Sequence, residues 1–222
     1  MSDEPASPPA NRWVKAWPDA LAFVAGLALA WFNDWQTKDL VWSLWLSSLL
    51  VGYAMILWDI FGMPISALKT AVGGAQPVDF PVAGTVLVFV GRLFLLAFFT
   101  VHFGMFHFVH ATLLNVFFPV LPGRHGFLDM HIFLRVLADY WPFVLVAAVA
   151  ERKAFRRAAE VAKSGGLMQP YKNVVRLHVL IFFFAFASFA KVGGFAVYVV
   201  VYAVYFFPWR LVFPSKTAVA AA

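Results

Sequence analysis

An apolar segment of 37 residues, Val82–Phe118, constrains this chain more than any other feature of its sequence. Among aliphatic and aromatic side chains it contains only Arg92, three histidines and a few small polar groups. About 20 apolar residues cross the hydrocarbon core of a bilayer, so the segment is long enough for a transmembrane helix. Because ionisable side chains are costly inside hydrocarbon, its histidines are candidate functional residues.

The composition assigns the whole chain to the membrane. Of its 222 residues, 63% are hydrophobic and only 13% are charged, which leaves too little polar surface to cover a soluble globule. The formal net charge of +6 fits loops that face the cytoplasm and anionic lipid, so we set nucleic-acid binding aside. The absence of cysteine excludes disulfides, thiolate metal sites and covalent haem attachment through the chain's own thiols.

The lengths of the apolar segments predict an all-α integral membrane protein, a helical bundle of about six transmembrane helices that forms one domain over residues 13–213. The predicted spans cover residues 17–32, 40–61, 90–118, 131–150, 173–190 and 194–211. A helix of 37 residues would overshoot the bilayer, so the third span either projects into the cytoplasm or places residues 82–91 along the interface. Residues 1–12 are expected to form a disordered cytoplasmic N-terminus and residues 214–222 a flexible tail.

The distribution of lysine and arginine sets the orientation. Of the 17 Lys and Arg residues, eleven fall in the two termini and in the connections at 62–80 and 151–172. The opposite side holds three, Lys38, Arg124 and Lys191. By the positive-inside rule, both termini are predicted to be cytoplasmic.

Two polar stripes mark a candidate site between the third, fourth and fifth spans. His102, His107 and His110 share somewhat less than half of the circumference of one helix, and His131, Arg135 and Asp139 follow one another at intervals of four residues. We expect two polar layers at different depths between these spans. The outer layer contains His107, His110, Asn115, Arg135 and Asp139, and the inner layer contains His102, His178 and either Arg92 or Arg176.

Such residues support several kinds of chemistry. Neutral imidazoles with a carboxylate can bind a transition metal ion, and His102 with His178 is the best pair for the axial ligands of a b-type haem. His, Asp and Arg could instead relay protons or bind a transported ion or solute, as in a small proton-coupled transporter. A third reading is that they only hydrogen-bond one another and hold the bundle together, as in a structural subunit of a membrane complex.

Other residues suggest packing. Ser43, Ser47, Ser48 and Gly52 give the second span a face of small residues, which suits close helix contact. Several tryptophans near the predicted span ends, among them Trp35 and Trp42, are expected to lie at headgroup level. No nucleotide-binding loop, nucleophile elbow or His-Glu-x-x-His motif occurs, so most chemistries of soluble enzymes have no support.

The segment His102–His110, with a histidine, an aromatic residue, Gly104 and a final Val-His pair, resembles an uncharacterised domain-of-unknown-function family of bacterial and archaeal polytopic membrane proteins. Residues 44–52 and 170–178 resemble it as well. The resemblance favours His102, Gly104, His110 and His178 as functional residues. In that family an acidic residue often stands where this chain has Ser47, which implies a lost or altered activity if the carboxylate matters.

Together these features predict a multi-pass protein of the bacterial inner membrane with a histidine-based metal or haem site. The expected partners are the lipid bilayer and a further membrane protein or a second copy of the chain. The candidate ligands are His102, His110, His178 and His107, and their candidate polar partners are Asp139, Arg135, His131 and Arg92.

Overall fold

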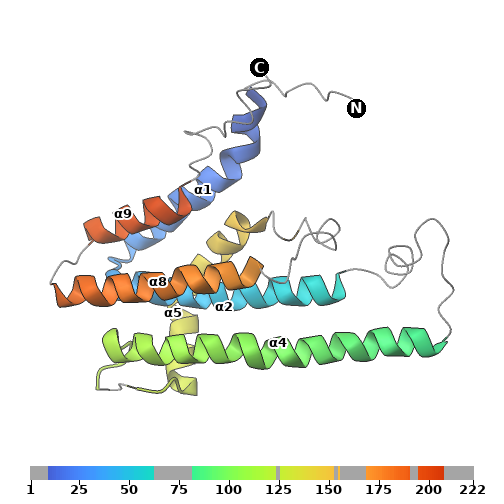
Figure 1. Ribbon diagram of the computed structural model, residues 1–222. Helices are drawn as coiled ribbons and strands as arrows, with labels where there is room; N and C mark the ends of the chain where they lie inside the picture. Colours follow the sequence, from blue (N-terminus) through green and yellow to red (C-terminus); the bar gives the residue numbers. More distant parts are fainter. Residues whose placement is uncertain are drawn as a thin grey trace.

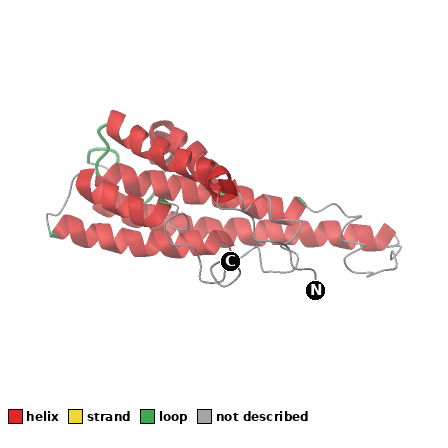
Figure 2. Cartoon of the chain, turned by 90° about the horizontal axis from the view of Figure 1, so that it is seen from above, coloured by secondary structure: helices red, strands yellow, loops and turns green. Residues whose placement is uncertain are grey.

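The computed structural model describes residues 10–62, 82–123, 126–152, 155, 169–190 and 195–207. Within the helices, the side chains of residues 10–16, 82–83, 169–170, 172–173, 176–178, 185, 188, 196–198 and 204–206 are not described. The described part is helical with short connections and contains no strand (Figure 2). Most of the predicted flexible ends and the predicted cytoplasmic connections lie outside the described residues, so these assignments stay predictions.

In the described part of the chain, six helices of more than ten residues occupy the positions of the six predicted spans. They are α1 (Ala10–Phe32), α2 (Thr37–Phe61), α4 (Val82–Phe117), α5 (Met130–Ala150), α8 (Gln169–Phe189) and α9 (Phe195–Phe206). Local hydrogen bonds explain where two of them begin. The Asp39 carboxylate accepts from the backbone N–H of Gln36 at the start of α2, and Asp129 accepts from Ile132 at the start of α5. Such bonds satisfy amides that have no partner within the helix.

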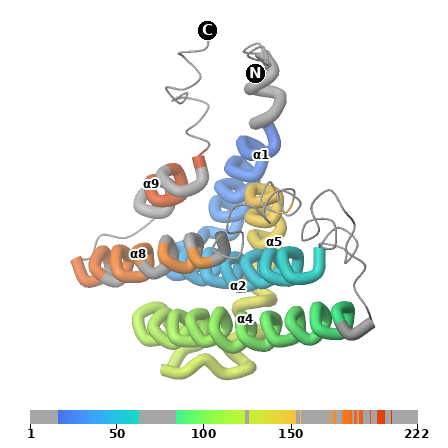
Figure 3. The backbone as a smooth tube through the Cα atoms, turned by 45° about the vertical axis from the view of Figure 1, so that its right-hand side comes forward, coloured from blue at the N-terminus to red at the C-terminus, as the bar shows by residue number. Residues whose placement is uncertain are grey.

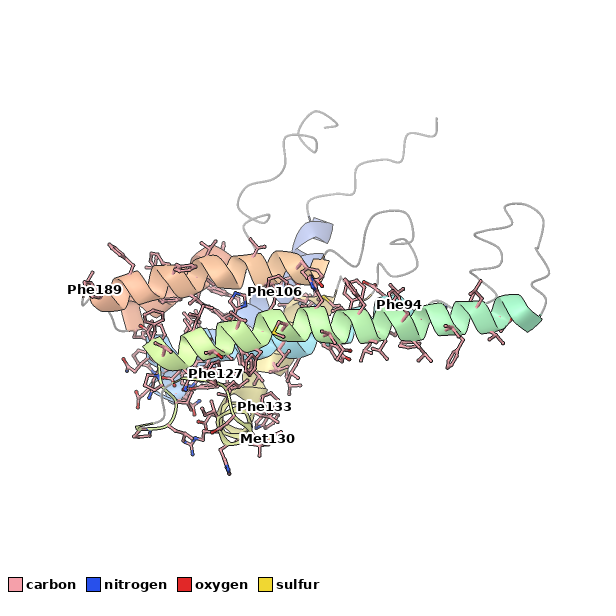
Figure 4. All side chains as sticks on the ribbon, turned by 60° about the horizontal axis from the view of Figure 1, so that its bottom comes forward. Phe94, Phe106, Phe127, Met130, Phe133 and Phe189 are labelled. Atoms are coloured by element: carbon pink, nitrogen blue, oxygen red, sulfur yellow. The ribbon has the colours of Figure 1, made fainter. Side chains whose placement is uncertain are left out.

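Judged on their described residues, three of these helices are long and apolar enough to cross a membrane, namely α2, α4 from Gly84 onwards, and α5. Large apolar side chains project from the outer surface, and Phe94 on α4 and Phe189 on α8 are 68% and 91% exposed (Figure 4). In the most apolar window of α4 only 11% of the residues are buried. Apolar side chains exposed over such an area indicate a helical membrane protein, because lipid tails cover them.

Helix α4 is one continuous helix of 36 residues (Figure 1). At 1.5 Å per residue it is about 54 Å long, which exceeds a hydrocarbon core of about 30 Å. No turn separates residues 82–91 from the rest of the helix. The alternative in which these residues form a separate interfacial segment is therefore wrong, and a projecting helix fits.

The helices do not form a single parallel bundle. Helices α2, α4 and α8 lie alongside one another, and α5 crosses them steeply in both Figure 1 and Figure 3. Helix α1 packs against α5 and is antiparallel to it. At one end of this pair Arg152 forms an ion pair with Asp19, and at the other Trp35 packs edge-on to Tyr140.

Helix α2 lies at the centre of the fold and packs against α4, α5 and α8. Residues Leu40–Ser47 are buried without interruption, so neighbours cover every side of this part of the helix. Trp35 and Trp42 are buried too, at 6% and 0% exposed, and their prediction as headgroup anchors is wrong. The predicted meeting of the third, fourth and fifth spans is wrong for the fourth, because α5 packs mainly on α2 and α1, whereas α4 does contact α8.

Small residues let the neighbours of α2 and α1 approach closely. The Phe103 ring of α4 lies over Gly52, where an added Cβ would come 2.6 Å from Cζ of that ring. On α1, Gly26 faces Tyr202 of α9 in the same way, and an added Cβ would overlap the Tyr202 hydroxyl. The predicted small-residue face of the second span is thus confirmed at Gly52.

Candidate functional site

Three histidines of α4 lie close together in the chain but in different environments. His107 and His110 are buried, at 1% and 2% exposed, and their rings lie 6.5 Å apart. His102, one turn and a half earlier, is exposed. The expectation that apolar surroundings turn all three imidazoles inward is therefore right for two of them and wrong for His102.

His107 is hydrogen-bonded at both ring nitrogens, at Nδ1 within α4 and at Nε2 across to α2. Nδ1 lies 3.0 Å from the backbone carbonyl oxygen of Phe103, and Nε2 lies 3.2 Å from the hydroxyl of Ser48. A carbonyl only accepts, so Nδ1 carries a proton, and in the neutral imidazole Nε2 then accepts from the Ser48 hydroxyl. Both ring nitrogens are thus used within the protein, and the bond at Nε2 joins α4 to α2.

Two tryptophans of α2 reinforce this contact. The indole N–H of Trp45 donates to the carbonyl oxygen of His107 over 2.9 Å, and that of Trp42 donates to the carbonyl oxygen of Phe118 over 2.8 Å. The Tyr53 hydroxyl lies 2.7 Å from that of Thr100, which itself donates to its own helix. The sequence analysis missed these bonds. The signal was the indole N–H of Trp42 and Trp45, because a tryptophan buried away from the membrane interface needs a hydrogen-bond acceptor inside the protein.

His102 makes ring contacts with residues of two helices. Its imidazole stacks on Phe98 at 5.4 Å with an interplanar angle of 13° and meets Phe106 edge-on at 5.1 Å. The ring of Tyr171, from the start of α8, lies 5.7 Å away. Within the described part of the chain, His102 forms no hydrogen bond, and the buried hydroxyl of Tyr171 has no partner there either.

The polar residues of α5 do not join the histidines of α4. Arg135 and Asp139 form an ion pair with each other, with an N–O distance of 2.7 Å and side chains 58% and 31% exposed. His131 is exposed in the first turn of α5. The buried contact of this region is instead the Tyr140 hydroxyl, which donates to the Asp39 carboxylate over 2.6 Å. The expected outer layer is therefore wrong for Arg135 and Asp139, because α4 and α5 each pack mainly on α2 rather than on one another, whereas His107, His110 and Asn115 are buried.

The described residues do not form a cluster of metal ligands. No group of three or more His, Asp or Glu side chains among those residues could hold a metal ion. His178 belongs to α8, but its side chain lies outside the described set, so its pairing with His102 in a haem site stays a prediction. Tyr171, seven residues before His178, is the α8 residue whose ring lies beside His102. Arg92 is half-buried on the projecting part of α4.

Two further residues that the resemblance singled out occupy different surroundings. Ser47, at the position where the family often has an acid, is buried and donates to the Ser43 carbonyl over 2.7 Å. An added Cβ at Gly104 would meet nothing within 4 Å. Packing within the described chain therefore explains a glycine at Gly52 but gives no reason for one at Gly104.

Long apolar helices, a lipid-compatible surface and a buried polar contact between α2 and α4 define an all-helical membrane protein. A family of unknown function (DUF6498) matches residues 6–207, and the chain belongs to this family. The predicted membership of an uncharacterised family is thereby confirmed. No curated protein and no solved structure matches the chain.

Proposed function

We propose that this chain is a multi-pass protein of the bacterial inner membrane that binds a small ligand from the hydrocarbon phase at His102. The observation that carries the proposal is the exposed imidazole of His102 on α4, the most apolar of the three described helices that are long enough to cross a membrane. A polar group in hydrocarbon is costly unless a partner meets it, so such residues usually serve a function.

The choice of His102 is supported by a comparison with the other two histidines of α4. Both nitrogens of His107 are used within the protein, and His110 is buried beside it. His102 alone of the three presents its ring to the outside of the helix bundle. Among the histidines of the predicted site whose side chains the structure describes, His102 is therefore the residue that a ligand reaches without repacking the core. A b-type haem with His102 as one axial ligand belongs to this proposal, as do other lipophilic cofactors and substrates.

The test is to identify what the protein retains when it is purified from membranes in mild detergent. We expect one organic-soluble compound to accompany the wild type in a fixed ratio and to be lost in His102→Phe, which keeps an aromatic ring. His131→Phe is the matched control, because His131 is an exposed histidine on another helix. Mass spectrometry of solvent extracts detects organic ligands, the Soret region of the absorbance spectrum detects haem, and elemental analysis detects metal ions. Identical results for the three proteins would contradict the proposal.

We further propose six membrane crossings with both termini in the cytoplasm. The support is the coincidence of six helices with the six apolar segments and the excess of Lys and Arg on one side. Because the chain has no cysteine, single cysteines can be introduced and labelled with an impermeant maleimide in intact cells. Gly123→Cys is expected to react from outside and Lys69→Cys only after the cells are opened. Labelling of Lys69→Cys in intact cells would refute this topology.

A further inference from the structure

We propose that the ligand of His102 is an isoprenoid quinone, whose flat ring lies against the aromatic rings around His102 and whose carbonyl oxygen accepts the imidazole N–H. This inference rests on the proposed function, since it names the class of ligand that the same site takes. It concerns binding and assigns no reaction.

The depth of His102 is the first argument. Helix α2 runs from Thr37 to Phe61, so its midpoint lies next to Ser48, which bonds to His107 of α4. His102 is five residues from His107, or about 7.5 Å along the helix. With α2 centred in the bilayer, His102 lies well inside a half-thickness of about 15 Å. Its ligand must therefore dissolve in hydrocarbon.

The polarity of His102 is the second argument. A neutral imidazole carries one N–H donor and one acceptor nitrogen. The described part of the chain offers this ring aromatic contacts and no hydrogen bond. Acyl chains offer no acceptor at this depth. The ligand must therefore bring a polar atom, and a carbonyl oxygen satisfies the N–H without a charge.

The surrounding rings are the third argument. Phe98, parallel to the imidazole, and Phe106, perpendicular to it, are themselves 49% and 44% exposed. Together with Tyr171 of α8 they present ring faces and edges from two helices at one level. Flat rings pack on such a surface by offset stacking and edge contacts. A planar ligand ring therefore makes more favourable contacts with this surface than a branched or acyclic chain does.

Other membrane-soluble ligands fit these conditions less well. Phospholipid and sterol polar groups lie at the interface, about 15 Å from the centre of the bilayer. A haem brings two carboxylates that need cations, and the cation of α4, Arg92, is ten residues or about 15 Å away from His102. The side chains of Lys172 and Arg176 on α8 lie outside the described set. An isoprenoid quinone combines a planar ring, neutral carbonyl acceptors and a tail that dissolves in lipid.

The experiment titrates the purified full-length protein with short-chain ubiquinone and short-chain menaquinone and follows the quenching of tryptophan fluorescence. An isoprenoid alcohol with the same tail controls for binding through the tail. Loss of one hydrogen bond to a neutral acceptor is expected to weaken quinone binding about tenfold in His102→Phe. His131→Phe should bind like the wild type. Quinone extracted from the purified protein should fall by the same order in His102→Phe alone.

The outcomes separate this inference from the proposed function. Saturable quinone binding that weakens only in His102→Phe supports both. Equal affinity in wild type and His102→Phe, or equal binding of the alcohol, overturns the quinone assignment. If a different compound or a Soret band accompanies the wild type and is lost in His102→Phe, the quinone assignment is wrong and the proposed function stands. If no compound depends on His102, both fail.

Discussion

The contact between Gly52 and Phe103 allows a quantitative prediction. A Cβ added at Gly52 would lie 2.6 Å from Cζ of Phe103 and 3.5 Å from both Cε atoms. Carbon atoms in good contact are about 3.5–4.0 Å apart, so the ring must retreat by about 1 Å. The ring has little room, because Phe103 is fully buried and lies 4.3 Å from the imidazole of His107. Overpacking of this kind costs about 1–3 kcal/mol.

Gly104→Ala is the matched control for Gly52→Ala. Both positions lie inside helices, and alanine gains up to about 1 kcal/mol over glycine at such a position in water. At Gly104 this gain is not opposed, because an added Cβ meets nothing within 4 Å. The difference between the two variants therefore isolates the overpacking cost, and we expect Gly52→Ala to be less stable than Gly104→Ala by about 1–3 kcal/mol.

The assay is the free energy of unfolding in mixed micelles, titrated with sodium dodecyl sulfate and followed by tryptophan fluorescence. A second substitution, Phe103→Leu, shortens the ring that collides with the new methyl group. The double variant Gly52→Ala/Phe103→Leu is therefore expected to be more stable than the sum of the two single effects predicts. Equal stability of Gly52→Ala and Gly104→Ala, or strictly additive effects in the double variant, would refute the reasoning.

Three more predictions use the same assay. Trp45→Phe removes the bond to the His107 carbonyl and leaves a smaller ring, so unfolding should become easier by about 1–3 kcal/mol; no change would mean that the indole N–H is dispensable. Tyr140→Phe takes the donor away from Asp39 and should cost about 1–2 kcal/mol. Asp139→Asn should change stability by less than about 1 kcal/mol, since its ion pair is partly exposed, and a larger loss would reveal a buried role.

The positions of the helices were predictable from the sequence, but which helices pack against one another was not. Apolar length placed the second and fourth spans at 40–61 and 131–150, and the structure has α2 at Thr37–Phe61 and α5 at Met130–Ala150. A helix that is apolar on all sides, however, does not show which face meets protein and which meets lipid. The central position of α2 depends on close contacts such as Phe103 on Gly52, which no periodicity reveals.

The candidate site was predictable only in part for a related reason. The shared helical face correctly placed His107 and His110 in the interior. The partner of His107 is Ser48 of α2, a residue that had been interpreted only as a small residue for packing. Depth placed Asp139 and His110 in one predicted layer, but depth says nothing about which helix lies between two others. In this fold that helix is α2.

The central helix has a consequence for biosynthesis. Helix α2 leaves the ribosome before α4, α5 and α8, and its first half ends up enclosed by helices made later. Two of its hydroxyls do not depend on later helices, because Ser43 and Ser47 donate to carbonyls of their own helix. The indoles of Trp42 and Trp45 instead donate to carbonyls of α4 and of the residue that follows it, and the hydroxyls of Ser48 and Tyr53 bond to side chains of α4. Helix α2 therefore enters lipid with only some of its polar groups satisfied, and the arrival of α4 completes these four bonds.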